Sequence, residues 1–168
     1  TIGNGLSYVP VRPRSTNFVS SHTAYMIYGW APIELSLIAS KMMLVWTEAI
    51  GGRLGNGSRF SNTIVYNTFP VPELTDQNRL DLTRCAEEIV LSRETHFPMS
   101  IAELYGTKDG ESLMPEDLRR AHDKNDEVLE RIYIGRKFKN DTERLEKLFD
   151  LYTKMTAGQT KPKKGKRK

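Results

Sequence analysis

Residues 33–73 read IELSLIASKMMLVWTEAIGGRLGNGSRFSNTIVYNTFPVPE, and this stretch divides the chain into two unlike halves. Its first part is apolar on most faces, which predicts one helix over 33–50 that neighbouring elements bury on several sides. Pro32 suits the first position of that helix, and the Gly-Gly pair after residue 50 ends it. The Pro-Val-Pro sequence at 70–72 then stops regular structure before the second half begins.

Between the helix and the prolines lies a loop, residues 51–62, that is rich in glycine, serine and arginine. Glycine allows positive φ and a close approach of the backbone. Arg53 and Arg59 carry planar donor forks that match phosphate or guanine. Residues 63–66 alternate weakly and predict an extended segment. Composition alone favours a flexible surface loop with solvated charges over a binding loop.

The two flanks of this stretch differ in pattern. Upstream, residues 7–11 and 23–28 have the composition of short strands. Downstream, helical spacing of apolar residues predicts a small bundle whose short connections favour antiparallel neighbours. The expected helix signals there are an N-cap at Thr75, a capping box at Ser100–Glu103, Pro115 as a helix start and a second box at Asn140–Glu143. The apolar stripes are Leu82, Cys85, Ala86, Ile89 and Val90, then Leu118, Ala121, Asn125, Val128, Leu129 and Ile132, then Leu145, Leu148, Phe149, Tyr152 and Met155.

The predicted fold class is therefore α+β and mostly α overall. A partial, mixed strand and helix region at 1–72 is followed by an all-helical bundle at 73–157 and a basic tail at 158–168. We expect the tail to be disordered because it is of low complexity and highly charged.

Charge is divided unevenly, although the total is only +4. Residues 1–72 have a net charge of +3, residues 73–160 have −5 and residues 161–168, KPKKGKRK, have +6. A basic segment suits nucleic acid or an acidic surface, whereas an acidic helical block suits packing or protein partners.

The remaining composition bears on compartment and cofactors. The chain begins with threonine rather than methionine, so we expect a segment of a longer protein. Its single cysteine, Cys85, excludes an internal disulfide framework and fits a reducing, cytoplasmic compartment. The three histidines show no metal-ligand spacing with it, and no apolar run is long enough for a transmembrane helix.

No catalytic constellation is recognisable. The chain lacks a Gly-x-Gly-x-x-Gly cofactor loop and a P-loop, and NTFP at 67–70 differs at both core positions from the Asn/Asp-Pro-Pro-Tyr/Phe motif of amino-methyltransferases. His122 and Asp126 lie one helical turn apart, where a polar contact on the helix surface is favoured over an acid–base pair. Cys85 lies on an apolar stripe and is interpreted as a small core residue. We therefore predict no catalytic, cofactor-binding or metal-binding residue in this chain.

Six blocks of sequence follow one another in a specific order. They are SLIASKMMLVWTEAIGGRL at 36–54, SRFSNTIVYNTFPVPE at 58–73, AEEIVLSRE at 86–94, SIAELY at 100–105, MPEDLRRAHDKNDEVLERIY at 114–133 and ERLEKLFDLY at 143–152. In this order they resemble the C-terminal part of MmeI-like proteins, which are large single-chain bacterial restriction–modification enzymes. Phe60 and Val71 depart from the tyrosine and tryptophan usual in that family.

The resemblance implies a parent that is an S-adenosylmethionine-dependent DNA adenine-N6 methyltransferase, with or without a fused endonuclease. S-adenosylmethionine would be bound by an upstream methyltransferase domain of the same polypeptide, and no cofactor by this segment. Residues 1–72 would be the C-terminal portion of a target recognition domain for double-stranded DNA. Residues 73–157 would be the helical C-terminal domain.

Within such a recognition domain, the glycine-rich loop is where contacts with DNA are expected, with the preceding helix as its platform. Arg59 would read a base, and Arg53, next to the helix end, would contact a phosphate. Asn56 would pair with adenine. The phosphate contacts implied for the remaining polar residues are those of Ser58, Ser61, Asn62 and Lys41.

Two other classes of function fit the same composition. One is a non-catalytic helical scaffold whose acidic bundle docks a protein partner, and the other is an RNA-binding accessory protein that uses the basic tail. A scaffold predicts no DNA affinity at low salt. An RNA-binding protein predicts a preference for single strands and loss of affinity when residues 161–168 are deleted.

Overall fold

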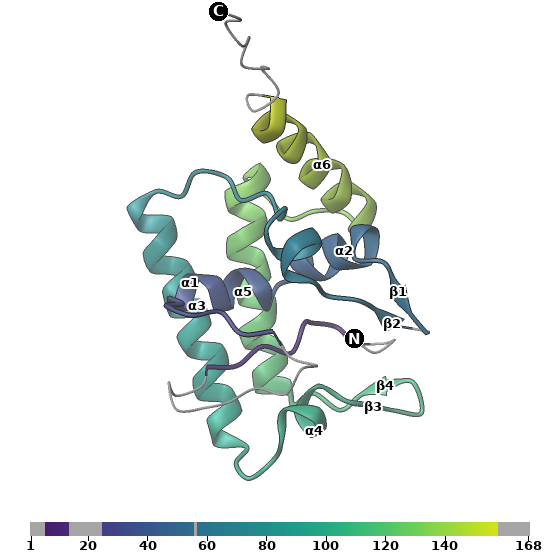
Figure 1. Ribbon diagram of the computed structural model, residues 1–168. Helices are drawn as coiled ribbons and strands as arrows, with labels where there is room; N and C mark the ends of the chain where they lie inside the picture. Colours follow the sequence, from purple (N-terminus) through teal and green to yellow (C-terminus); the bar gives the residue numbers. More distant parts are fainter. Residues whose placement is uncertain (1–5, 14–24, 56, 158–168) are drawn as a thin grey trace, which may run out of the picture.

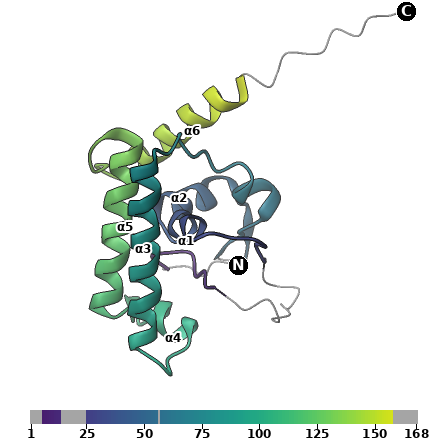
Figure 2. The same cartoon turned by 90° about the vertical axis from the view of Figure 1, so that its left-hand side faces the viewer.

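The computed structural model describes residues 6–13, 25–55 and 57–157, and most of these residues are helical (Figure 1). Two long helices, α3 (Asp76–Thr95) and α5 (Glu116–Ile134), run antiparallel side by side and form one wall of the molecule (Figures 1 and 2). The predicted antiparallel arrangement of neighbouring helices is thus observed for this pair.

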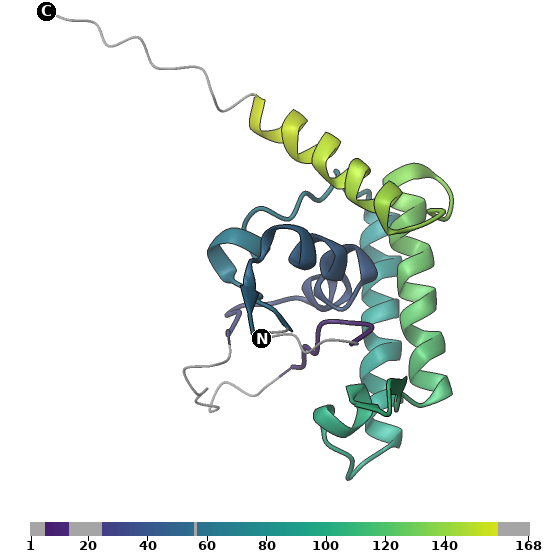
Figure 3. The ribbon, with the colours of Figure 1, turned by 90° about the vertical axis from the view of Figure 1, so that its right-hand side faces the viewer.

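Two short helices, α1 (Pro32–Ile38) and α2 (Lys41–Ile50), lie against one side of this wall, as Figure 2 shows. The helix α1 packs mainly on α3, and α2 packs on α6 (Asp141–Ala157). The helix α6 projects away from the rest of the molecule (Figure 3). A short helix, α4 (Ile101–Tyr105), follows α3 in the chain.

Strands among the described residues are confined to two antiparallel hairpins that project from the same side of the molecule in Figure 1. β1 (Arg53–Leu54) pairs with β2 (Gly57–Ser58), and β3 (Thr107–Lys108) pairs with β4 (Glu111–Ser112). The predicted class, α+β and mostly helical, is confirmed. The prediction that 73–157 is all helical is wrong, because the β3–β4 hairpin lies within this range.

A π-helical turn, η1 (Asn62–Tyr66), follows the first hairpin. The extended segment predicted at 63–66 is therefore wrong. The Ser61 hydroxyl accepts a hydrogen bond from Ile64 N at 3.0 Å and starts the turn. This cap satisfies a backbone N–H of the first helical turn, which favours the helical conformation over an extended one.

The apolar run predicted as a single helix over 33–50 is two helices, so that prediction is also wrong. α1 ends at Ile38, and Ser40 caps α2 with an extended backbone (φ −102°, ψ 157°) and a hydroxyl that accepts from Met43 N at 3.2 Å. Serine is a preferred N-cap because its oxygen satisfies a backbone N–H that the first helical turn leaves unpaired. The break allows the two helices to pack on different neighbours.

The strands predicted at 7–11 and 23–28 do not form within the described residues, which exclude the first two positions of the second segment. Pro10 cannot donate to a ladder, which disfavours a paired strand. Tyr8 and Val9 are both buried, and they belong to two different apolar clusters. The segment therefore passes between the two clusters instead of joining a sheet.

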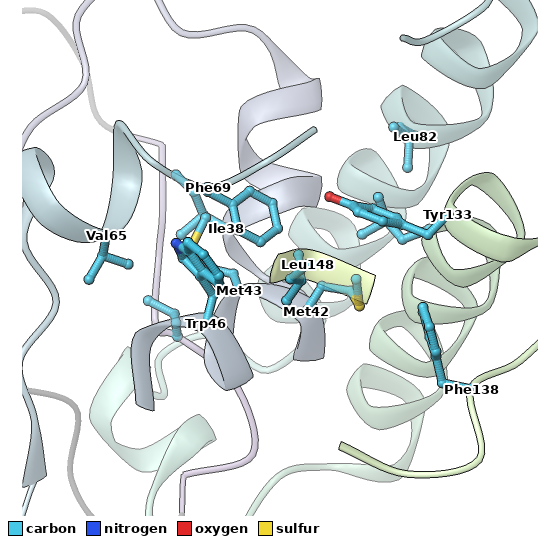
Figure 4. Packing of buried hydrophobic residues seen from close by; sticks show 12 residues of the cluster. Ile38, Met42, Met43, Trp46, Val65, Phe69, Leu82, Tyr133, Phe138 and Leu148 are labelled. Carbon is cyan, nitrogen blue, oxygen red and sulfur yellow. The ribbon is translucent and has the colours of Figure 1, made fainter. Parts of the chain in front are cut away.

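Both clusters combine side chains from the two predicted domains. The α2 cluster, which Figure 4 shows, consists of Val9, Ile38, Met42, Met43, Trp46, Val65, Phe69, Leu82, Leu129, Tyr133, Phe138 and Leu148. The α1 cluster consists of Tyr8, Leu35, Ala39, Ala86, Ile89, Leu104, Tyr105, Met114, Leu118 and Ala121. The division into 1–72, 73–157 and 158–168 stays a prediction, and the shared clusters argue against independent folding of 73–157.

Most of the helix signals predicted for residues 73–157 are observed in the structure. Thr75 caps α3 by accepting from Asn78 N, and Ser100 with Glu103 forms the predicted capping box of α4. Asn140 accepts from Glu143 N at 2.9 Å, but the Glu143 carboxylate accepts from a neighbouring N–H instead, so the second box is only half formed. The last stripe is also less buried than predicted, since only Leu148 of α6 is fully enclosed.

Gly51, at the end of α2, is required by close packing. A Cβ atom there would lie 2.5 Å from the carbonyl oxygens of both Thr47 and Arg59. Both oxygens belong to the backbone, which cannot move aside without a cost in free energy. Gly51→Ala is therefore expected to lower the free energy of unfolding by about 1–3 kcal/mol, measured by chemical denaturation.

Gly55 offers the control for this prediction. It has a positive φ of 61°, and nothing lies within 4 Å of a Cβ placed there. Because asparagine tolerates the left-handed region, Gly55→Asn should stay close to the wild-type stability. Equal stability of Gly51→Ala and wild type would contradict the packing argument.

Candidate nucleic-acid interface

The glycine-rich loop folds as a hairpin that grows directly from the end of α2. The N–H of Gly51 donates to Thr47 O at 2.8 Å, and Arg59 N donates to Gly52 O at 3.1 Å. Gly52 and Gly55 both have φ above 60°, a conformation that side chains with Cβ atoms rarely adopt. The glycines thus allow the chain to reverse within a few residues of the helix end.

The hairpin presents its two arginines to solvent. Arg53 pairs with Ser58 across the hairpin, and successive side chains of a strand point to opposite faces. Arg59 follows Ser58 directly after the end of β2, so we expect the two arginines to extend from opposite faces. Both are exposed, and among the described residues neither has a carboxylate within ion-pair distance. Their donor forks are available to a ligand.

The other polar residues of the loop are partly used to shape it. The Ser61 hydroxyl accepts from Ile64 N, and Asn62 Oδ1 accepts from Thr63 N at 2.9 Å. Ser58 is half-buried in β2. Asn56 lies outside the described residues, so its predicted contact with adenine stays a prediction.

Lys41 is separated from the rest of the predicted site. It is the first residue of α2, whereas the hairpin follows the last residue, about 15 Å away at 1.5 Å per residue. Its ammonium lies 3.8 Å from Asp123 Oδ1 and 4.0 Å from Asp126 Oδ2. The structure thus groups the loop residues but not Lys41, whose predicted phosphate contact its position does not favour.

His122 and Asp126 do not form the predicted contact on the surface of the helix. Both are buried and bind groups from distant parts of the chain. Asp126 Oδ1 accepts from Lys41 N at 2.8 Å and Oδ2 accepts from the Tyr8 hydroxyl at 3.0 Å. The prediction of a solvated i,i+4 contact is therefore wrong, because tertiary packing encloses this face of α5.

The protonation of His122 follows from its two partners. Nδ1 faces the Ala39 carbonyl oxygen at 3.0 Å, which can only accept, so this nitrogen carries the proton. Nε2 then accepts from the Tyr105 hydroxyl at 2.6 Å, and that hydroxyl in turn accepts from Arg93. Burial and the nearby Arg93 charge lower the pKa of His122 to about 3. The imidazole is therefore neutral at physiological pH and is a poor candidate for a general acid.

The pKa of Asp126 shifts in the opposite direction from the pKa of His122, and burial is again the main cause. Burial raises the pKa of its carboxyl to about 7, against the lowering effect of the Lys41 backbone and charge. Tyr8, which donates to it, stacks on the His122 ring at a centroid distance of 4.0 Å. Sequence spacing alone does not reveal this network, because Tyr8, Ala39 and Lys41 lie 118, 83 and 85 residues from the α5 side chains that they bind.

Other chemistry finds no support in the described part of the chain. Cys85 is buried, and burial raises the pKa of its thiol to about 11, which confirms its interpretation as a core residue. In residues 6–13, 25–55 and 57–157, no group of three His, Cys, Asp or Glu side chains is arranged to hold a metal ion. No helix there has the length and apolarity that a membrane crossing requires.

Two family models match this chain and together cover nearly all of it. Residues 3–73 match the target recognition domain of MmeI, and residues 74–159 match the MmeI C-terminal domain. The boundary between the two matches lies one residue from the boundary predicted at 72.

Individual relatives agree with these matches. DNA methyltransferase A of Bacillus subtilis (strain 168) is 36% identical over 149 residues, which are 89% of this chain and 16% of the relative. A solved structure of the Type IIL restriction-modification enzyme MmeI in complex with DNA superposes with a TM-score of 0.86 at 29% identity, over 93% of this chain and 20% of that chain. This chain thus spans a fifth or less of the length of either relative.

Proposed function

Because this chain belongs to the MmeI-like family of restriction–modification enzymes, we propose that the hairpin loop 51–62 contacts double-stranded DNA. Residues 1–72 are then the C-terminal portion of a target recognition domain. Residues 73–157 are the helical domain that supports it through the two shared apolar clusters.

The hairpin is the observation that carries this proposal. It holds two exposed arginines without a described carboxylate partner, on opposite faces of a short ribbon that a buried helix supports. A two-stranded ribbon fits the major groove of DNA, and an arginine fork matches guanine O6 and N7. Opposite faces imply different roles, with Arg59 directed at a base and Arg53 at the phosphate backbone.

The relatives support a wider proposal for the complete protein. One is by name a DNA methyltransferase, and the other is a restriction-modification enzyme in complex with DNA. We infer that the complete protein transfers a methyl group from S-adenosylmethionine to adenine N6 in bacterial cytoplasmic DNA. An upstream domain of the same polypeptide would bind the cofactor, since this sequence lacks a cofactor loop. Cleavage of unmethylated DNA by the complete protein would reveal a fused endonuclease.

Family membership favours DNA recognition over the scaffold and RNA-binding alternatives. The three classes still differ in solution. DNA recognition predicts binding to duplex rather than single strands, and this binding should survive deletion of residues 161–168. A preference for single strands that disappears with the tail would favour RNA binding instead.

The decisive experiment replaces each arginine in the complete protein. Arg59→Ala is expected to lose discrimination at one base pair, at a cost of about 1–3 kcal/mol for the cognate duplex. Arg53→Ala should weaken binding to all duplexes and reduce the salt dependence by about one phosphate contact. Equilibrium binding to the cognate duplex and to single-mismatch duplexes, at two salt concentrations, measures both effects.

Arg79 provides a matched control. It is an exposed arginine in the first turn of α3. In Figure 1 the helix α3 and the β1–β2 hairpin lie on opposite sides of the molecule. Arg79→Ala should keep the wild-type affinity and mismatch penalty. If Arg53→Ala and Arg59→Ala behave in the same way as this control, the hairpin is a connector and the proposal fails.

A further inference from the structure

Three side chains on one face of α5 bind the backbone at the break between α1 and α2. His122 Nδ1 donates to Ala39 O at 3.0 Å, and Asn125 Nδ2 donates to Ser36 O at 2.9 Å. Asp126 Oδ1 accepts from Lys41 N at 2.8 Å. Their spacing of three and four residues places them on one stripe of the helix. We call these three residues, His122, Asn125 and Asp126, the α5 clamp.

The clamp satisfies backbone groups that a broken helix leaves unpaired. Carbonyl groups in the last turn of α1 and the first N–H of α2 have no partner within their own helix. Ser36 and Ala39 are fully buried, as are His122 and Asn125, so water cannot replace the two bonds between them. The bond from Lys41 N to Asp126 is part-buried. An unsatisfied buried backbone group is costly, which means that the clamp fixes the direction in which α2 leaves the break.

A rigid path leads from the clamp to the hairpin. α2 has ten residues and is followed by its C-cap Gly51, where the backbones of Thr47 and Arg59 approach so closely that no side chain fits. At 1.5 Å per residue the hairpin begins about 15 Å from Lys41, so a tilt of about 10° would move it by more than about 2 Å. Binding groups must be held to within about 0.5 Å, so such a tilt would misplace the arginines.

We propose that the α5 clamp is a positioning element for DNA recognition, which sets the angle at which the hairpin meets DNA. This inference rests on the proposed function of the hairpin. The clamp itself would not contact DNA. It acts through the orientation of α2, so its loss should affect base discrimination more than non-specific attraction to phosphate.

The test compares two substitutions of Asp126 in the complete protein. Asp126→Ala removes the acceptor for Lys41 N, and Asp126→Asn keeps an oxygen in the same place. Asp126→Ala is expected to reduce the ratio of cognate to mismatched affinity by about tenfold, since small displacements of binding groups have effects of this order. Asp126→Asn should restore the wild-type ratio. Affinities are measured at a temperature where melting curves show each variant to be folded.

Leu104→Ala separates positioning from loss of stability. Leu104 is buried in the α1 cluster on α4, and it takes part in none of the three clamp bonds. It should lower the melting temperature but keep the mismatch ratio. If Asp126→Ala does not fold, Asn125→Ser takes its place, since it removes the donor to Ser36 O while leaving a small polar group.

The outcomes distinguish the two proposals when Arg59→Ala is measured in parallel. Loss of discrimination in Arg59→Ala together with a wild-type ratio in the folded clamp variants overturns the positioning role alone. A wild-type ratio in Arg59→Ala as well overturns both. A ratio that falls equally in Leu104→Ala and Asp126→Ala would assign the effect to stability and also overturn the positioning role.

Discussion

Trp46→Ala is expected to lower the free energy of unfolding by about 3–5 kcal/mol, the range for removing a large buried aromatic side chain. Trp46 is only 1% exposed and belongs to the α2 cluster (Figure 4). Its ring centroid is 5.1 Å from that of Phe149 and 5.7 Å from that of Tyr152 on α6. Its indole N–H donates to Thr68 Oγ1 at 3.3 Å.

The substitution should also loosen α6, because two of the aromatic contacts of that helix are with Trp46. Amide hydrogen exchange should then increase more in 141–157 than in α3, which has no aromatic ring contact with Trp46. Trp46→Phe is the control, since it keeps an aromatic ring and loses volume and the hydrogen bond. Chemical denaturation that shows Trp46→Ala to be as stable as Trp46→Phe would contradict the packing of α6 on α2.

The N-cap residues explain which helix starts could be predicted from the sequence. α3 and α4 begin where Thr75 and Ser100 predict, because a cap is a local interaction within four residues. The same kind of signal was present at Ser40 and at Ser61. At Ser40 the apolar run predicted a continuous helix, and after Ser61 the weak alternation predicted an extended segment. In both places the serine instead caps the start of a helical segment.

Periodicity was less reliable for burial than for helix formation. Phe149 and Met155 continue the predicted stripe of α6, yet they are 42% and 49% exposed. α6 packs mainly on α2, and it projects beyond the rest of the molecule toward its C-terminal end (Figure 3). The pattern specifies which face is apolar, but the length of the partner decides how much of that face is covered.

The residues of the candidate site also differ in whether the sequence could predict them. Arg53 and Arg59 could be singled out from the sequence because an arginine in a glycine-rich loop has few local partners. The α5 clamp could not, because the partners of His122 and Asp126 lie 83 and 85 residues away. Spacing on one helix indicates that two side chains share a face. It does not indicate that another element covers this face, which is what changes a solvated pair into a buried network.

A second buried polar contact holds the start of α6 to α5. Glu130 is 3% exposed, and its carboxylate accepts hydrogen bonds from Arg144 Nε at 2.9 Å and from Phe138 N at 3.0 Å. The Arg144 guanidinium makes a further bond to the same carboxylate and reaches Asp141 at the surface. It also lies over the Phe138 ring, 5.8 Å from the centroid. Arg144 is thus the counterion of a carboxylate that water barely reaches.

Arg144→Met should therefore lower the free energy of unfolding by about 3–5 kcal/mol, because it keeps the aliphatic volume but leaves the buried Glu130 charge without a partner. In the double variant Glu130→Gln/Arg144→Met, the neutral amide still accepts from Phe138 N and no charge is buried. Much of the loss should then be recovered, which denaturant titration of the wild type, both single variants and the double variant would measure as a coupling energy. Arg136→Met is the surface control: Arg136 pairs with Glu143 at 2.5 Å in an exposed bridge, where the expected cost is only about 0–1 kcal/mol. A cost for Arg144→Met as small as that of Arg136→Met would mean that Glu130 is solvated in solution and that α6 is not anchored by this pair.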